Sequence, residues 1–101
     1  MNIIVKKYGG SSLSSPERIK EAAKNISASK KKGDRVVVVC SAMADSTDNL
    51  MSLASQVSNK PDKREMDLLI STGEVVASTL MALALNSLSH KAISLTGTQA
   101  G

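Results

Sequence analysis

Residues 36–40 read Val-Val-Val-Val-Cys, and this run decides the fold class of the chain. The run contains no polar residue, which predicts a strand buried on both faces, and such strands are typical of parallel sheets. An earlier apolar run covers residues 3–5, and a helical pattern lies between the two runs. Two strands joined by a helix predict a parallel pair with a right-handed crossover.

The helix between these strands has clear end signals. Ser15 is placed as the N-cap and Pro16 as the first helical residue. Three lysines, 30–32, precede Gly33, which suits the position after the helix end. Since cations complement the dipole at a helix C-terminus, we interpret these lysines as a helix end rather than a nucleic-acid patch. The predicted inward face consists of Ile19, Ala22, Ala23 and Ile26.

The rest of the chain predicts two more helices and a third strand. Ser46 or Thr47 can cap a helix that reaches Val57, and Asp62 can cap the next. That last pattern is interrupted at residues 71–74, resumes to about residue 85, and is followed by an apolar run at 91–95 and a loop at 96–101. The predicted order βαβααβ is that of an α/β fold built on a parallel, Rossmann-like sheet.

Composition narrows the classes of function. The chain has 101 residues, a net charge of +4 and one aromatic residue, Tyr8. Proteins that bind single-stranded nucleic acid normally stack bases on aromatic side chains, so this composition argues against that class. The single cysteine, Cys40, predicts a buried thiol in a reducing compartment. We find no signal peptide or membrane span, and we expect a cytoplasmic protein without a nucleic-acid or membrane partner.

Three loops rich in small and hydroxyl residues follow the predicted strands, at 7–12, 41–45 and 96–101. Ligands of open α/β sheets bind at the carboxyl ends of the strands, so we expect the site there. Lys7 precedes Gly9 and Gly10, an order that matches neither the P-loop nor the dinucleotide fingerprint. These residues alone fit a phosphate cradle and a plain tight turn equally well.

Other candidates keep two interpretations each. For Ser41, Thr47 and Asp48, one interpretation is that Thr47 and Asp48 simply cap a helix, which the spacing favours, and the other is that a hydroxyl here holds a carboxylate or phosphoryl group beside the cradle. Glu74 could begin a new helix after a break at Gly73, or hold a substrate ammonium group. One histidine and one cysteine far apart in the sequence argue against a zinc site, and we expect no metal ligands from this segment.

Four segments taken together resemble one known family. They are KYGGSSL at 7–13, VVVVCSAMADSTDNL at 36–50, REMDLLISTGE at 64–74 and SLTGTQAG at 94–101. In order and spacing they are similar to the N-terminal part of aspartokinases, in the amino-acid kinase family. The resemblance implies a three-layer sandwich, of which residues 1–101 would be the N-terminal part of the catalytic domain, with the remainder and the regulatory ACT domains lying beyond residue 101.

The resemblance also implies an activity, the ATP-dependent phosphorylation of the β-carboxylate of L-aspartate to 4-phospho-L-aspartate. This is the first step toward lysine, threonine and methionine, with Mg²⁺ accompanying ATP and a homo- or hetero-oligomer in the full-length form. The phosphate-contacting residues would be Lys7, Tyr8, Gly9, Gly10, Ser11 and Ser12, with Lys7 also stabilising the transferring phosphoryl group. The aspartate side would be Ser41, Thr47 and Glu74, with Glu74 on the α-ammonium.

The chain departs from the family pattern at Ala44, where glycine is usual, and at Ser46, where threonine is common. It is also several times shorter than the family's enzymes, so we expect negligible kinase activity from these 101 residues alone. The alternatives are a non-catalytic subunit or interaction fragment, and an amino-acid kinase with another carboxylate or a carbamate as acceptor.

Overall fold

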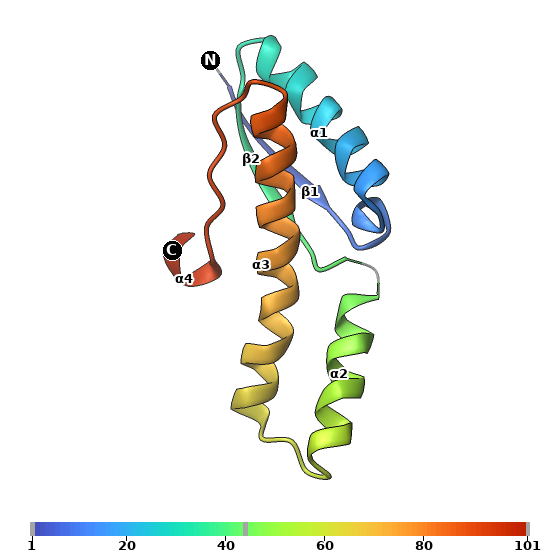
Figure 1. The fold of residues 1–101 in the computed structure, drawn as a ribbon. Helices are drawn as coiled ribbons and strands as arrows, with labels where there is room; N and C mark the ends of the chain where they lie inside the picture. Colours follow the sequence, from blue (N-terminus) through green and yellow to red (C-terminus); the bar gives the residue numbers. More distant parts are fainter. Residues whose placement is uncertain (1, 44, 101) are drawn as a thin grey trace.

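The computed structural model describes residues 2–43 and 45–100 (Figure 1). Ala44 and Gly101, which belong to two of the motifs above, lie outside the described residues. The elements are β1 (Ile3–Tyr8), the short 3-10 helix η1 (Ser11–Leu13), α1 (Pro16–Lys31), β2 (Arg35–Cys40), α2 (Ser46–Val57), α3 (Lys63–Ser87) and α4 (Gly97–Ala100).

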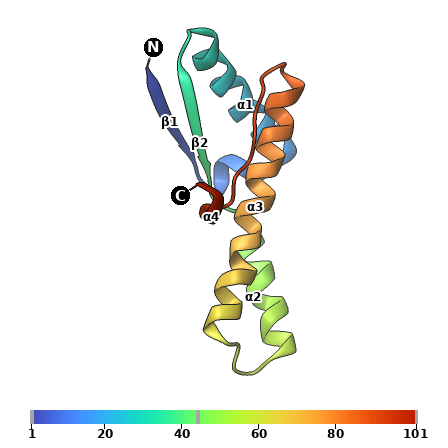
Figure 2. The same cartoon turned by 90° about the vertical axis from the view of Figure 1, so that its left-hand side faces the viewer.

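β1 and β2 pair in parallel, with Ile3 opposite Arg35 and Tyr8 opposite Cys40. This pairing confirms the predicted parallel α/β class. The expectation that the valine run is buried on both faces is wrong for the described residues, because exposure alternates along both strands. Val37 and Val39 are 51% and 45% exposed, whereas α1 and α3 lie on the opposite face of the sheet (Figure 2). The described residues therefore form a sheet layer and one helix layer.

The core lies between the covered face of the sheet, α1 and α3. Leu13 is completely buried beneath the start of α1, and Cys40 is buried at the end of β2, as the sequence predicted. The inward face of α1 consists of the four residues predicted from the sequence, together with Ser27. The remaining core residues come from α3 and are Ala77, Met81 and Leu85.

Both predicted ends of α1 are confirmed. The Ser15 hydroxyl accepts a hydrogen bond from the Arg18 backbone N–H at 3.2 Å, and Pro16 is the first helical residue. At the other end Gly33 has a φ of +92°, and its N–H donates to the Lys30 carbonyl at 3.0 Å. Glycine suits this position because side chains clash with the backbone in the left-handed region.

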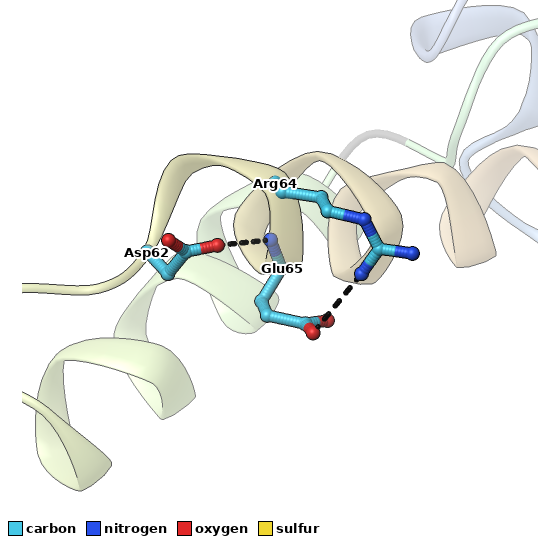
Figure 3. Close-up of polar contacts among 3 residues, drawn as sticks. All are labelled: Asp62, Arg64 and Glu65. Carbon is cyan, nitrogen blue, oxygen red and sulfur yellow. Dashed lines mark hydrogen bonds and ion pairs between the residues drawn. The ribbon is translucent and has the colours of Figure 1, made fainter.

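α3 begins where the sequence predicts and continues further than expected. The Asp62 carboxylate accepts a hydrogen bond from the Glu65 N–H at 3.1 Å, and Arg64 forms an exposed ion pair with Glu65 (Figure 3). The predicted interruption at residues 71–74 is absent, since α3 is one helix of 25 residues. The hydroxyls of Ser71 and Thr72 donate to carbonyls of the preceding turn, which satisfies these polar groups inside the helix.

Two further predictions differ from the structure. Asp45, not Ser46 or Thr47, is the N-cap of α2, and no side-chain hydrogen bond caps this helix. Residues 91–95 are not a strand. Their exposure alternates as in a strand, and Ile93 is 84% exposed, but they have no ladder partner among the described residues. An apolar run becomes a strand only where a neighbouring strand accepts its backbone hydrogen bonds.

The length and apolar composition of α3 would by themselves allow a membrane span. Ala77, Met81 and Leu85 nevertheless pack into the core against α1 and the sheet. In this structure α3 is therefore a core helix, and beyond the sheet it pairs with α2 as a hairpin (Figures 1 and 2).

Candidate functional site

The last residues of β1 point to opposite faces of the sheet. Lys6 and Tyr8 face α1, where the Lys6 ammonium and the Tyr8 hydroxyl each donate to the Asn25 side-chain oxygen at 2.9 Å. Lys7 lies between them and is exposed. Since successive side chains of a strand alternate in direction, Lys7 lies on the uncovered face of the sheet. Of the two lysines, only Lys7 is free of this contact with α1.

Tyr8 is held within the fold. Its burial raises the pKa of the phenol above its ordinary value, and the neighbouring Cys40 thiol adds to the effect in the same direction. The hydroxyl is also occupied by Asn25. The Tyr8 side chain thus anchors β1 to α1, a contact that was not predicted from the sequence. The family resemblance implied only that Tyr8 belongs to the phosphate-contacting segment.

The glycine pair leaves open space after β1. A side-chain carbon added to Gly9 would meet nothing within 4 Å, and Gly9 does not occupy the left-handed backbone region. Gly10 has an ordinary helical backbone, with a φ of −59°. Ser11 and Ser12 follow in η1 and are exposed. The fold itself therefore does not require glycine at position 9, which leaves room for a ligand close to the backbone.

A hydrogen bond joins the first two loops of the predicted site. The Ser41 N–H donates to the Tyr8 carbonyl at 3.0 Å, one residue beyond the end of β2. The loop that begins at Ser41 therefore starts beside the loop that contains Gly9 and Gly10. This is the meeting of loops at the carboxyl edge that the sequence predicted.

α3 meets the second loop at Gly73, which is buried. A side-chain carbon placed on Gly73 would lie 3.1 Å from the Ala42 methyl carbon and 3.5 Å from the Ser46 Cβ. Glu74 follows Gly73 on α3 and is exposed, while Thr47 is half-buried in the first turn of α2. Sequence reasoning missed this close approach at Gly73, although a glycine inside a helical pattern was a signal.

Two hollows lie between α2 and α3. The smaller, of about 210 Å³, adjoins the Gly73 contact and is lined by Ser46, Asn49, Leu50, Thr72, Gly73 and Val76. The larger, of about 410 Å³, lies toward the far end of the α2–α3 hairpin and is lined mainly by apolar residues such as Leu53, Val57, Met66 and Leu69. None of the predicted site residues lines the larger hollow. None of them lines the smaller hollow either, although Ser46 and Gly73, the chain neighbours of Thr47 and Glu74, do.

The fourth motif forms a short capped turn. The Thr96 N–H donates to the Gln99 side chain at 2.9 Å, and the Gln99 N–H donates to the Thr96 hydroxyl at 3.2 Å. This reciprocal pair is a capping box. In both views α4 lies at the height of the carboxyl ends of β1 and β2 (Figures 1 and 2).

The path from α3 to this turn is fixed by side chains. Asn86 accepts a hydrogen bond from the Ala92 N–H at 3.0 Å, and the His90 ring is hydrogen-bonded to the Ser27 hydroxyl on α1 at 2.6 Å. His90 therefore lies in the connection after α3 and ties it to α1. Ser89 has a φ of +69°, the left-handed conformation in which helices commonly end.

Comparison with known proteins gives a consistent result. The model of the amino acid kinase family matches residues 2–101. The chain is 54% identical over all 101 residues to the aspartokinase of Corynebacterium glutamicum and, equally, to that of Geobacillus stearothermophilus. It covers 24% and 25% of these relatives, so it spans about a quarter of their length.

A solved structure of aspartate kinase from Synechocystis superposes with a TM-score of 0.88 at 47% sequence identity, covering 94% of this chain and 16% of that one. The agreement in fold therefore extends over nearly all of the chain. Together with the family match over residues 2–101, this shows that the chain belongs to the amino acid kinase family.

Proposed function

We propose that the chain forms the N-terminal part of the catalytic domain of an aspartate kinase, which transfers the γ-phosphoryl group of ATP to the β-carboxylate of L-aspartate. The observation that carries this proposal is the 54% identity to curated aspartokinases over the whole chain. The products are ADP and 4-phospho-L-aspartate, the entry compound for lysine, threonine and methionine. A cytoplasmic location and an oligomeric full-length enzyme belong to the same proposal.

The phosphate side of the site is formed by residues 7–12. Phosphoryl transfer needs positioning and neutralisation of charge more than covalent help from the protein. Lys7 is exposed at the end of β1 and supplies a positive charge, while the open space at Gly9 lets ATP phosphates approach the backbone. Gly10, Ser11 and Ser12 continue this loop and can donate further hydrogen bonds.

The aspartate side is formed by Ser41, Thr47 and Glu74. The hydroxyls can hydrogen-bond a carboxylate, and the Glu74 carboxylate can hold the α-ammonium group. The close approach of Gly73 to Ala42 and Ser46 supports this grouping. Each of the three proposed aspartate-binding residues is the chain neighbour of one residue in that contact. In this arrangement the negative charge of Glu74 pairs with the substrate ammonium group, and the positive charge of Lys7 pairs with the ATP phosphates.

Magnesium is expected to accompany ATP. Within residues 2–43 and 45–100, no three His, Cys, Asp or Glu side chains are grouped so that they could hold a metal ion. The oxygen ligands of Mg²⁺ in such sites come largely from phosphates and water, with one or two carboxylates. When bound, the ion would neutralise phosphate charge, and in this segment the complementary charge comes from Lys7.

The test is aspartate-dependent ADP release by the full-length gene product, with hydroxylamine added to trap the acyl phosphate as a hydroxamate. Lys7→Ala should lower kcat by about a hundredfold or more, as expected for the loss of a charge that stabilises the transition state. Glu74→Gln should mainly raise the KM for aspartate, whereas Glu21→Gln on the exposed side of α1 should change neither constant. An enzyme that releases ADP with another carboxylate or a carbamate, but not with aspartate, would refute the assignment.

A further inference from the structure

The contact at Gly73 is unusually close for the middle of a long helix. Gly73 is buried near the centre of the 25-residue α3. A side-chain carbon there would lie 3.1 Å from the Ala42 methyl, 3.5 Å from the Ser46 Cβ and 3.8 Å from Leu50. Glycine is a poor helix former, so it weakens α3 at this point. In return, glycine at position 73 allows α3 and the loop after β2 to approach each other closely.

The residues at this contact are chain neighbours of the three proposed aspartate-binding residues. Ser41 precedes Ala42, Thr47 follows Ser46, and Glu74 follows Gly73. The spacing between α3 and the loop therefore sets how far Glu74 lies from the two hydroxyls. No side chain of Gly73 can touch a substrate, so its role is one of position.

We propose that Gly73 is a positioning residue for the amino-acid substrate, a small amino dicarboxylate, because it sets how closely α3 approaches the loop after β2. This inference rests on the proposed function. The missing side chain lets α3 and the loop after β2 meet, so the segment that carries Glu74 lies against the segment that carries Ser41 and Thr47.

The effect of a methyl group at position 73 follows from the distances. Ordinary van der Waals contacts begin at about 3.4 Å, so the new methyl would push the Ala42 methyl away by a few tenths of an ångström. The Ala42 methyl is attached directly to the backbone, so the loop itself must move. Gly9 lies outside this contact, since nothing of the protein comes within 4 Å of its would-be side chain. The shift therefore affects the aspartate side selectively.

The experiment uses Gly73→Ala in the full-length enzyme. We expect the KM for aspartate to rise about tenfold and the KM for ATP to change less than about twofold, because binding groups must be held within about 0.5 Å of their productive geometry and a misplacement of about 1 Å can cost a hundredfold. The double variant Ala42→Gly/Gly73→Ala removes the opposing methyl and should restore the aspartate KM. Thr79→Ala adds an alanine at an exposed site of the same helix and should leave both KM values unchanged.

The possible results separate this inference from the proposed function. An active wild type whose aspartate KM is unchanged by Gly73→Ala overturns the positioning role, as does an equal rise in both KM values. A double variant that keeps a raised aspartate KM also overturns it, and this variant serves if Gly73→Ala alone does not fold. A wild type without aspartate-dependent turnover removes the proposed function, and with it the basis of the inference.

Discussion

Gly9→Ala separates a ligand-binding role of the glycine pair from a purely structural one. A methyl at Gly9 would meet no atom within 4 Å, and the backbone there is not left-handed. Replacing glycine by alanine in a compatible conformation restricts the unfolded chain and stabilises a protein by about 0.4–1 kcal/mol. The free energy of unfolding should therefore be unchanged or slightly increased.

ATP binding should respond in the opposite direction. If phosphate oxygens approach the backbone at Gly9, the methyl occupies their space and removes at least one hydrogen bond to a charged group. Such a bond contributes about 1.5–3 kcal/mol, which corresponds to roughly a tenfold to hundredfold rise in the KM for ATP. The KM for aspartate should change much less, because its proposed ligands lie on the second loop and α3.

Gly33→Ala is the matched control. A methyl at Gly33 also meets nothing within 4 Å, but its φ of +92° lies in the left-handed region. Alanine there should cost about 1–2 kcal/mol of stability. Gly33 precedes the amino end of β2, at the sheet edge opposite the proposed site, so the KM for ATP should not change.

Urea denaturation and steady-state kinetics on the wild type and both variants provide the comparison. The two variants should show opposite effects. Gly9→Ala should lose ATP affinity without losing stability, and Gly33→Ala should lose stability without losing ATP affinity. A KM for ATP that stays within twofold in Gly9→Ala would refute the phosphate cradle. A Gly9→Ala chain less stable than Gly33→Ala would show that the open space at residue 9 is wrongly described.

Three more predictions concern stability and can be measured by urea denaturation. Leu13→Ala should cost about 2–5 kcal/mol because Leu13 is completely buried, and a loss below 1 kcal/mol would contradict its place in the core. His90→Ala should cost about 1–3 kcal/mol, since it leaves the buried Ser27 hydroxyl without a partner; the cost should largely vanish in a Ser27→Ala background. Burial raises the pKa of the Cys40 thiol, so wild-type stability should fall as the pH rises from the ordinary thiol pKa, about 8.5, through the higher value of the folded state. This fall should be smaller in Cys40→Ala, and identical pH profiles would count against it.

The elements that the sequence predicted well are those with local causes. Ser15 and Asp62 cap helices by hydrogen bonds to N–H groups three residues later, and Gly33 ends α1 by its own backbone freedom. These signals act within about one helical turn, so they can be predicted from the sequence without knowledge of any tertiary contact. The inward face of α1 was likewise predictable from the helical spacing of its apolar residues.

The errors have non-local causes. Residues 91–95 have the composition of a strand, but strand formation depends on a partner that composition does not specify. The valine run of β2 was expected to be covered on both sides, and which face α1 and α3 cover is settled by packing. Glycine and hydroxyl residues at 71–73 suggested a break, yet the close contact with Ala42 accommodates the glycine within a continuous helix.

The sequence by itself determined the parallel α/β class, both ends of α1, the start of α3 and, through four motifs, the family, because these depend on local chemistry and on residue order. Only the tertiary structure decided that Lys6 and Tyr8 are tied to Asn25 while Lys7 is exposed, since this depends on which face of β1 meets α1. It also decided that Gly73 joins the loop after β2 to α3. That contact depends on the distance between backbones far apart in the chain, which no local pattern encodes.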